Sequence, residues 1–158
     1  MVRASASLVI DVPIQAVFDF VADIENMDMW INGVTAPKRT SEGEFGVGST
    51  FESDYTYAGR THSVAYRTIE FNRPTRTASV WTSGPFPFEA VTELEPSGEG
   101  TRITHTIDAG PNNRAVAIWF VVFGPILRPL MRRQLRRELL SLKELLEDRS
   151  DHPLDRGP

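Results

Sequence analysis

The chain has 158 residues, of which 41% are hydrophobic and 24% charged, and its formal net charge is −4. This length suits one domain, and the composition is typical of a globular protein rather than of a disordered or fibrous chain. The absence of cysteine excludes disulfides, thiolate metal sites and cysteine nucleophiles. The N-terminus has one basic residue and a short apolar stretch, unlike a signal peptide, so we expect a cytoplasmic protein.

The beginning of the chain predicts a strand followed by short helices. SASLVIDVP alternates in part and ends at Pro13, which predicts a strand from about Ala4 to Val12. Apolar residues then recur at helical spacing from Ile14 to Val21, and Pro13 suits the start of a helix. Asp23 and Asn26 favour a stop and a restart, so we expect two short helices.

Residues 34–108 have the pattern of strands separated by turns. The turn signals are EGEFGVGS, AGR, NRPT, SGPFP and PSGEG. Because no helical pattern lies between them, about six strands in an antiparallel meander are predicted.

The chain after Pro111 is predicted to be helical. Apolar residues step by three or four from Leu127 to Leu146, which indicates a stripe along one side of a long helix. The uncharged run AVAIWFVVFGPIL, residues 115–127, would rise about 20 Å as a helix, too little for a hydrocarbon core of about 30 Å. The pair Gly124–Pro125 predicts a break or a helix start in this run. Residues 149–158 lack periodicity, so we expect a domain of residues 1–148 and a flexible tail.

This order of elements resembles the helix-grip fold of the START/Bet v 1-like superfamily, particularly its bacterial polyketide cyclase/dehydrase and lipid-transport branch. The resemblance covers about Ala4 to Glu147 and rests on VIDVPIQAVFDFVADIENMDMW, FGVGSTF, GTRITHTID and RPLMRRQLRRELLSLKELLE. It implies an α+β fold in which a curved seven-stranded antiparallel sheet wraps around the long C-terminal helix. In such a fold the sheet and the helix stripe enclose a pocket for a small or medium hydrophobic molecule.

Alternation along the strands predicts which side chains line this pocket. Aromatic faces opposed by carboxylates are expected to point inward, and RITHTID turns His105 to the same side as two isoleucines. The face that carries Arg67 is ambiguous, because both faces of that strand hold apolar residues. The predicted wall consists of Trp30, Phe51, Tyr55, Trp81, Phe86, Phe88, Phe123, Leu127 and Met131, with Arg67 and His105 as polar anchors.

Arg67 is either a pocket residue or a solvated strand residue. Inside an apolar pocket it would need a carboxylate, a carbonyl or a polar ligand to offset a desolvation cost of several kcal/mol. Aligning the turn SGPF, residues 83–86, with a similar turn in bacterial aromatic polyketide aromatase/cyclases matches Arg67 to that family's pocket arginine. The resemblance implies that this arginine binds and polarises poly-β-ketone carbonyls. Val34 departs from that family's pocket tyrosine, and Val80 departs from its second pocket arginine.

Two functions follow from these residues. The first is a carrier or binding protein for an aromatic polyketide-like or acyl/lipid molecule. The second is a polyketide aromatase/cyclase or dehydratase in which Arg67 stabilises an enolate and His105 moves protons. His105 as a hydrogen-bonded wall residue is the alternative to that role. His62 and His152 are expected at the surface and in the tail, and no motif predicts a metal site or a cofactor.

Residues 114–137 contain six arginines and no acidic residue. Such asymmetry occurs at contacts with nucleic acid or anionic membranes, and the acidic net charge argues against nucleic acid. Trp119, Phe120 and Phe123 beside the basic cluster suit transient docking on a membrane surface. Alternatively, the arginines solvate a packed helix and pair with acidic strand residues. An exposed aromatic patch here would instead indicate a protein-binding module, and the sequence leaves a homodimer open.

Overall fold

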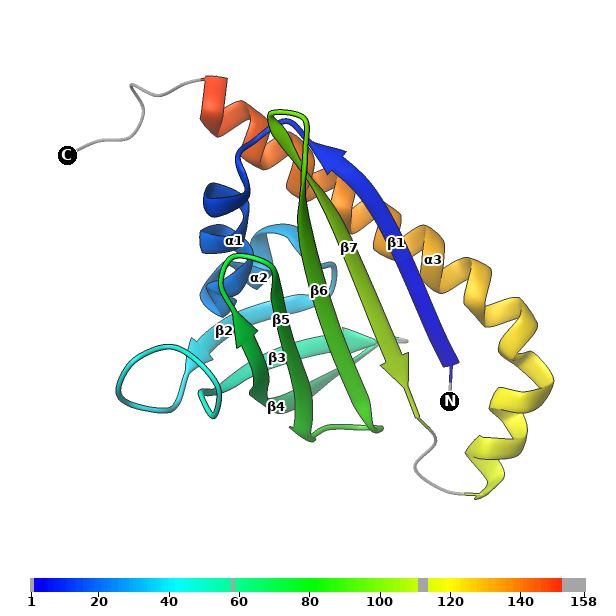
Figure 1. Ribbon diagram of the computed structural model, residues 1–158. Coiled ribbons are helices and arrows are strands. Elements are labelled where there is room, and N and C mark those ends of the chain that lie inside the picture. Colours follow the sequence, from blue (N-terminus) through cyan, green and yellow to red (C-terminus); the bar gives the residue numbers. More distant parts are fainter. Residues whose placement is uncertain (1, 58, 111–113, 152–158) are drawn as a thin grey trace.

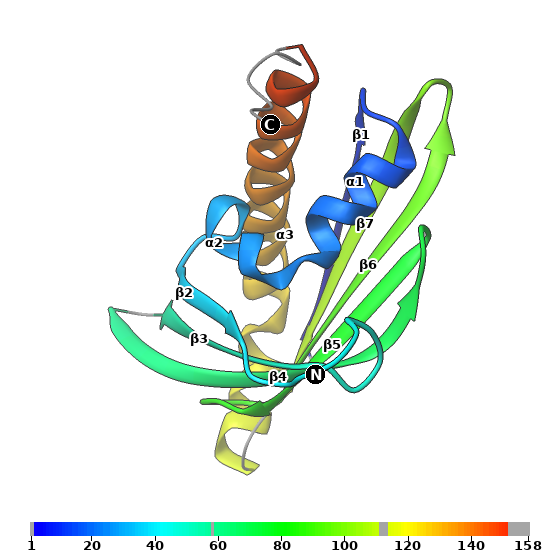
Figure 2. The same cartoon turned by 90° about the vertical axis from the view of Figure 1, so that its left-hand side faces the viewer.

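In the computed structural model, described for residues 2–57, 59–110 and 114–151, one antiparallel sheet curves around a long helix (Figure 1). The strands of this described part lie in the order β1-β7-β6-β5-β4-β3-β2. Short helices follow β1 and cover the concave face together with the last helix (Figure 2). The expected α+β helix-grip fold is confirmed. The elements are β1 (Val2–Ile10), α1 (Ile14–Ala22), the 3₁₀-helix η1 (Ile24–Asn26), α2 (Met27–Trp30), β2 (Val34–Arg39), β3 (Thr50–Tyr57), β4 (Arg60–Asn72), β5 (Arg76–Ser83), β6 (Phe88–Ser97), β7 (Gly100–Ala109) and α3 (Arg114–Asp151).

The first strand ends at Ile10, two residues before the predicted end. The backbone N–H of Asp11 donates to Glu147 Oε1 on α3 at 2.9 Å, and the carbonyl of Val12 accepts a hydrogen bond from Thr101 Oγ1 at 2.7 Å. These backbone groups are therefore satisfied by side chains rather than by a neighbouring strand. The chain leaves the sheet here and enters α1.

The stop and restart of the helices occur at Asp23, as expected. The Asp23 side chain accepts a hydrogen bond from the backbone N–H of Glu25 at 3.1 Å and caps η1. Such a cap satisfies a backbone donor that lacks a partner in the first turn of a helix. The chain therefore turns at this residue, and α2 approaches α3.

The apolar core occupies one side of the grip. It lies between α1, strands β1 and β7, and the second half of α3, which contributes part of the predicted leucine stripe. Val17, Phe18, Ile103, Leu139 and Leu142 are completely buried there. Close packing on this side holds the sheet and α3 together, and the middle strands contribute only Leu94 of β6 and the partly buried Phe71 of β4 to this core.

Helix α3 runs without a break from Arg114 to Asp151, so the predicted break or start at Gly124–Pro125 is wrong. Pro125 removes the hydrogen bond to the carbonyl of Val121. Val121 is 79% exposed, so that carbonyl lies on a solvated part of the helix, where water reduces the cost. Figure 1 shows the helix bending in this first half.

The C-terminal end of α3 includes residues 149–151, the first three of the predicted tail, and the remaining seven lie outside the described residues. In the described part of the chain, no helix combines the length and the apolar character needed to cross a bilayer.

Candidate ligand-binding cavity

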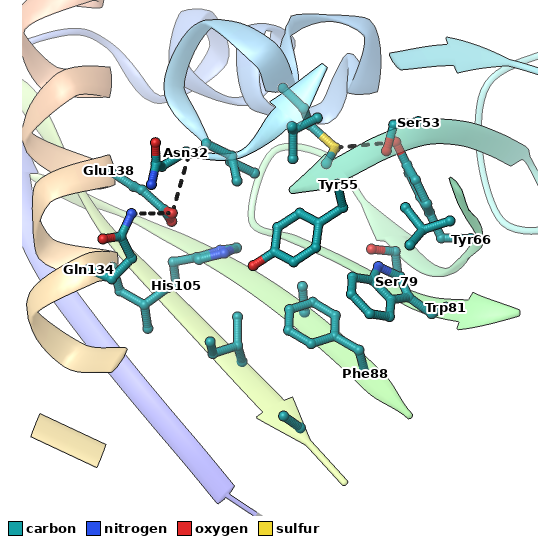
Figure 3. A pocket seen from close by; sticks show the side chains of 18 of the residues that line it. Asn32, Ser53, Tyr55, Tyr66, Ser79, Trp81, Phe88, His105, Gln134 and Glu138 are labelled. Atoms are coloured by element: carbon teal, nitrogen blue, oxygen red, sulfur yellow. Dashed lines mark hydrogen bonds between the residues drawn. The ribbon is translucent and has the colours of Figure 1, made fainter. Parts of the chain in front are cut away.

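A cavity of about 940 Å³ lies in the part of the grip that the core does not fill (Figure 3). Its walls are the inner faces of β3 to β7, the segment from the end of α1 to the start of β2, and residues 127–138 of α3. The exposed lining residues Thr56, Arg60 and Leu130 indicate that it opens near the β3–β4 hairpin and α3. Protein interiors leave few voids larger than a water molecule, so imperfect packing does not account for this space.

Aromatic side chains gather at one end of the cavity, around Trp81. The Trp81 ring stacks on Phe88 at 4.5 Å between centroids, and it lies 5.0 Å from Phe86 and 5.5 Å from Tyr55. Gly84 lies against the Trp81 ring as well, and a Cβ at position 84 would be 2.7 Å from a carbon of that ring. Because glycine has no Cβ, Gly84 leaves room for the Trp81 ring in this position. This end presents ring faces and edges to the cavity (Figure 3).

His105 lies deeper in the cavity and is 5% exposed. Its Nδ1 is 2.9 Å from Thr92 Oγ1, and its ring meets Trp30 edge to face at 5.5 Å between centroids. Burial lowers the pKa of His105 to about 4. The imidazole is therefore neutral at pH 7, and the bond to Thr92 fixes its orientation.

A buried carboxyl group, Glu138 of α3, lies at the polar end of the cavity (Figure 3). Its Oε1 accepts hydrogen bonds from the backbone N–H of Asn32 at 3.3 Å and from Gln134 Nε2 at 3.2 Å. Burial raises the pKa of Glu138 to about 7, although these two hydrogen bonds act in the opposite direction. Near neutral pH the group is therefore divided between its acid and its carboxylate form.

Most of the predicted wall residues border the cavity. The predicted aromatic side chains around Trp81 line it, and so do the first two residues of the apolar stripe on α3, Leu127 and Met131. Eight of the eleven predicted binding residues line it, namely Trp30, Tyr55, Trp81, Phe86, Phe88, His105, Leu127 and Met131. Their role in binding a ligand stays a prediction.

The prediction that Arg67 lies in the cavity is wrong, because its side chain is exposed outside the sheet. The inner face of β4 is formed by Val64, Tyr66 and Thr68, each no more than 3% exposed. The β4–β5 register shifts just after Thr68, and this bulge turns Phe71 inward although it has the same parity as Arg67. Strict alternation places Arg67 and Phe71 on the same face of β4, whereas in the structure Arg67 points outward and Phe71 inward.

The register between β4 and β5 also corrects the expectation, taken from the resemblance, that Arg67 and Val80 occupy pocket positions. Arg67 pairs directly with Val80 on β5, and directly paired residues share a face of a sheet. Neither lines the cavity, whereas the neighbouring pair Tyr66 and Trp81 does. Both positions that the resemblance matched to pocket arginines therefore lie outside, while Val34 does border the cavity.

Phe51 and Phe123 are also absent from the cavity wall. Phe51 is 1% exposed and packs against Phe45 and Tyr66, with ring centroids 5.3 and 5.7 Å apart. Its inward direction was predicted correctly, but η1 and the β2–β3 loop fill the space in front of it. Phe123 is 40% exposed and lies on the first half of α3, before the residues that reach the cavity.

Several polar lining residues were not predicted. Glu138, Gln134 and Asn32 form the polar end, and His62, expected at the surface, is half-buried in the cavity wall. Gln134 and Glu138 are spaced i, i+4 beside Leu135 and Leu139, a pattern that places them next to the buried stripe. That spacing was the available signal. His152 lies outside the described residues.

The fold and the cavity together define a helix-grip protein with an internal hydrophobic site. Among solved structures, the chain is similar to a protein from Thermus thermophilus, with a TM-score of 0.75, 19% identity, and 94% of this chain and 99% of that chain covered. A START superfamily protein from Mycobacterium smegmatis has a TM-score of 0.71 and 13% identity, with 94% and 99% covered. The di-domain aromatase/cyclase StfQ from the steffimycin biosynthetic pathway has a TM-score of 0.77 and 14% identity, with 95% of this chain and 52% of that chain covered.

The model of the family described as polyketide cyclase/dehydrase and lipid transport matches residues 1–147. The chain belongs to this family. Comparison with curated protein sequences finds no significant match.

Proposed function

We propose that the protein binds a neutral hydrophobic molecule with an aromatic or acyl body in this cavity, as its carrier or binding protein. The observation that carries the proposal is the cavity of about 940 Å³, which lies in the range of about 300–1,000 Å³ typical of small-molecule sites. Its aromatic end suits an apolar body, and its polar end offers a few hydrogen-bonding groups. The family description and the similarity to an aromatase/cyclase also support a hydrophobic ligand.

The charges around the cavity favour a ligand without a carboxylate. Glu138 would repel an anionic group at the polar end, and neutral His105 would not compensate it. Among the lining residues that the structure describes, the one permanently cationic side chain is Arg60, which is exposed near the opening. Burying an unpaired charge costs several kcal/mol. A hydroxyl or carbonyl is the group that these neighbours accommodate.

A polyketide cyclase or dehydratase is the second candidate function. Its version with Arg67 as the enolate-stabilising group fails, since that side chain is exposed outside the sheet. The observation that favours an enzyme is Glu138, because proton transfer is most efficient when the pKa lies near the working pH. His105, with a pKa of about 4, would be a poor proton donor at pH 7. An enzyme would therefore use Glu138 for proton transfer and His105 for hydrogen bonding.

Titration with N-phenyl-1-naphthylamine, a neutral aromatic fluorophore, tests the binding proposal. Ala90 lines the cavity, and Val91, the next residue of β6, does not. Ala90→Trp should fill part of the cavity and weaken binding by about tenfold or more, equivalent to about 1.4 kcal/mol. The matched variant Val91→Trp should keep the affinity within about twofold. Absence of saturable binding, or equal binding by both variants, would contradict the proposal.

The enzyme candidate has a separate readout. Incubation with a thioester of a poly-β-ketone, followed by mass spectrometry of the products, should leave the substrate unchanged if the protein is a carrier. If the protein catalyses cyclisation or dehydration, Glu138→Gln should abolish the product while fluorophore binding persists. Product formed equally by the wild type and by Glu138→Gln would exclude the proton-transfer role of Glu138.

A further inference from the structure

The first half of α3 exposes apolar side chains over several consecutive turns. Figures 1 and 2 show this part of the helix extending beyond the sheet. Among the described residues, six of the ten exposed large hydrophobic side chains lie between positions 118 and 130. They are Ile118 (66% exposed), Val121 (79%), Val122 (61%), Phe123 (40%), Ile126 (62%) and Leu130 (55%). Scattered exposed apolar residues are ordinary, but a contiguous group indicates a contact surface.

A group of exposed arginines follows this apolar surface along the helix. The members are Arg128, Arg132, Arg133, Arg136 and Arg137. None of them forms an ion pair with a described residue, so the prediction that they pair with acidic strand residues is wrong. All 21 acidic residues of the chain lie outside residues 114–137. The positive charge of this segment is therefore available to an external anion.

We propose that residues 118–137 of α3 dock on the surface of a bilayer that contains anionic phospholipids. The apolar turns from Ile118 to Ile126 rise about 12 Å along the helix axis. Interfacial helices bury their apolar side chains about 5–10 Å deep, so a tilted α3 can bury these turns at the headgroup boundary. The arginines that follow then lie at the level of the lipid phosphates. The docking surface is these residues, 118–137.

Charge distinguishes the bilayer from a second copy of the chain as the occupant. Packing the apolar turns of two copies together would also bring their arginine groups close, with five positive charges on each. Like charges that face each other across an interface oppose association. Anionic headgroups instead complement the arginines and attract each of them from solution. The same segment thus combines the two contributions that hold a helix at a membrane surface.

The docking surface is continuous with the cavity. Leu127, Leu130 and Met131 lie within it and also line the cavity, and Leu130 is among the exposed residues near the opening. A docked α3 therefore brings the opening toward the lipid phase, so an apolar ligand could pass between them with little exposure to water. This last step rests on the proposed function, whereas docking itself does not.

Vesicle partitioning tests the proposal with the full chain. Sedimentation with phosphatidylcholine vesicles containing 25% phosphatidylserine should pellet the protein at low salt, and 0.5 M salt or pure phosphatidylcholine should weaken binding. Val121→Asp with Ile126→Asp should abolish the partitioning. The matched control, Val47→Asp with Leu140→Asp, places two carboxylates at exposed apolar positions elsewhere, 69% and 41% exposed, and should retain it.

Charge removal provides the second comparison. Arg132→Gln with Arg133→Gln should weaken the vesicle partition coefficient about 30-fold, since each basic residue at an anionic surface contributes roughly fivefold. Lys38→Gln with Arg67→Gln removes two charges from exposed positions of the sheet and should change it less than about twofold.

Three results would overturn the proposal. The first is that the wild type does not partition onto the vesicles. The second is that both pairs of aspartate substitutions partition equally. The third is that the wild type forms a dimer and binds no vesicles, while Val121→Asp with Ile126→Asp is monomeric. The last result, from analytical ultracentrifugation, would assign the surface to a homodimer. Fluorophore binding separates the two proposals, because the docking variants should keep the wild-type affinity for the fluorophore, whereas Ala90→Trp should bind it more weakly and still dock.

Discussion

Replacing Glu138 by glutamine should make the protein more stable above neutral pH. The wild-type carboxyl is buried beside the cavity, and its Oε1 accepts two hydrogen bonds, from Asn32 and Gln134. Glutamine keeps an oxygen at this position but carries no charge at any pH. The substitution therefore isolates the cost of a buried carboxylate while it keeps the size of the side chain and an acceptor.

The magnitude follows from the pKa of Glu138, which folding raises from 4.5 to about 7. A carboxyl with a raised pKa stabilises the folded state fully below pH 4.5, and this contribution is lost as the pH rises to about 7. The total is about 3 kcal/mol, because one pKa unit corresponds to about 1.4 kcal/mol. Most of it, about 2–3 kcal/mol, should disappear between pH 5 and pH 8.

Urea unfolding followed by tryptophan fluorescence at pH 5, 6, 7 and 8 measures this effect. The difference in unfolding free energy between Glu138→Gln and the wild type should increase by about 2–3 kcal/mol over this pH range. Glu144→Gln, an exposed position on the same helix, should change the unfolding free energy by no more than about 0.5 kcal/mol. A difference that stays constant across this pH range would refute the inference that Glu138 is desolvated.

Four further substitutions test other parts of the structure. As the pH falls from 6.5 to 4, the wild type should lose about 3 kcal/mol of unfolding free energy, because the pKa of His105 is lowered to about 4. His105→Asn should not show this loss, and an equal loss in both proteins would contradict the prediction. Leu139→Ala should cost about 2–5 kcal/mol in urea unfolding, since Leu139 is fully buried, whereas Leu140→Ala, at 41% exposed, should cost no more than about 0.5 kcal/mol; equal costs would place the core elsewhere. Arg67→Ala should leave the affinity for N-phenyl-1-naphthylamine unchanged. A large loss of affinity would contradict the placement of Arg67 outside the cavity. Gly84→Ala should weaken the affinity for that fluorophore, because a Cβ would displace the Trp81 ring, and an unaltered affinity would show that the ring position is unimportant.

Local periodicity was sufficient to predict the order of the helices and strands, and the resemblance to the START/Bet v 1-like superfamily implied their arrangement as a helix grip. The apolar stripe of α3, the alternation of the strands and the stop at Asp23 each depend on a few neighbouring residues, and each occurs in the structure. The cavity wall on β6 and β7 followed from the same alternation, as Phe88 and His105 illustrate. These features were accessible because the side-chain direction there depends only on position along a regular element.

The remaining features depend on contacts between distant segments. The bulge in β4 reverses the alternation between Arg67 and Phe71, and no turn residue in the sequence marks it. Glu138 is buried at the polar end of the cavity, where Asn32, 106 positions away in sequence, donates a backbone hydrogen bond to it. Its spacing from Gln134 placed it beside the stripe, but charged residues on a helix are usually solvated. Tertiary packing, rather than local pattern, decided both outcomes.

The large core on one side of the grip means that the two sides of the fold are stabilised to different extents by the chain's own side chains. The side of β1, β7 and the second half of α3 is filled by the chain's own apolar side chains, whereas the opposite side has a smaller cluster around Phe51 and Tyr66 and borders the cavity. Under the proposed function, a bound molecule would supply further apolar contacts there and would add to the unfolding free energy by mass action. The melting temperature of the protein should therefore report whether it carries a ligand, and the most stable form in a cell extract should be the loaded one.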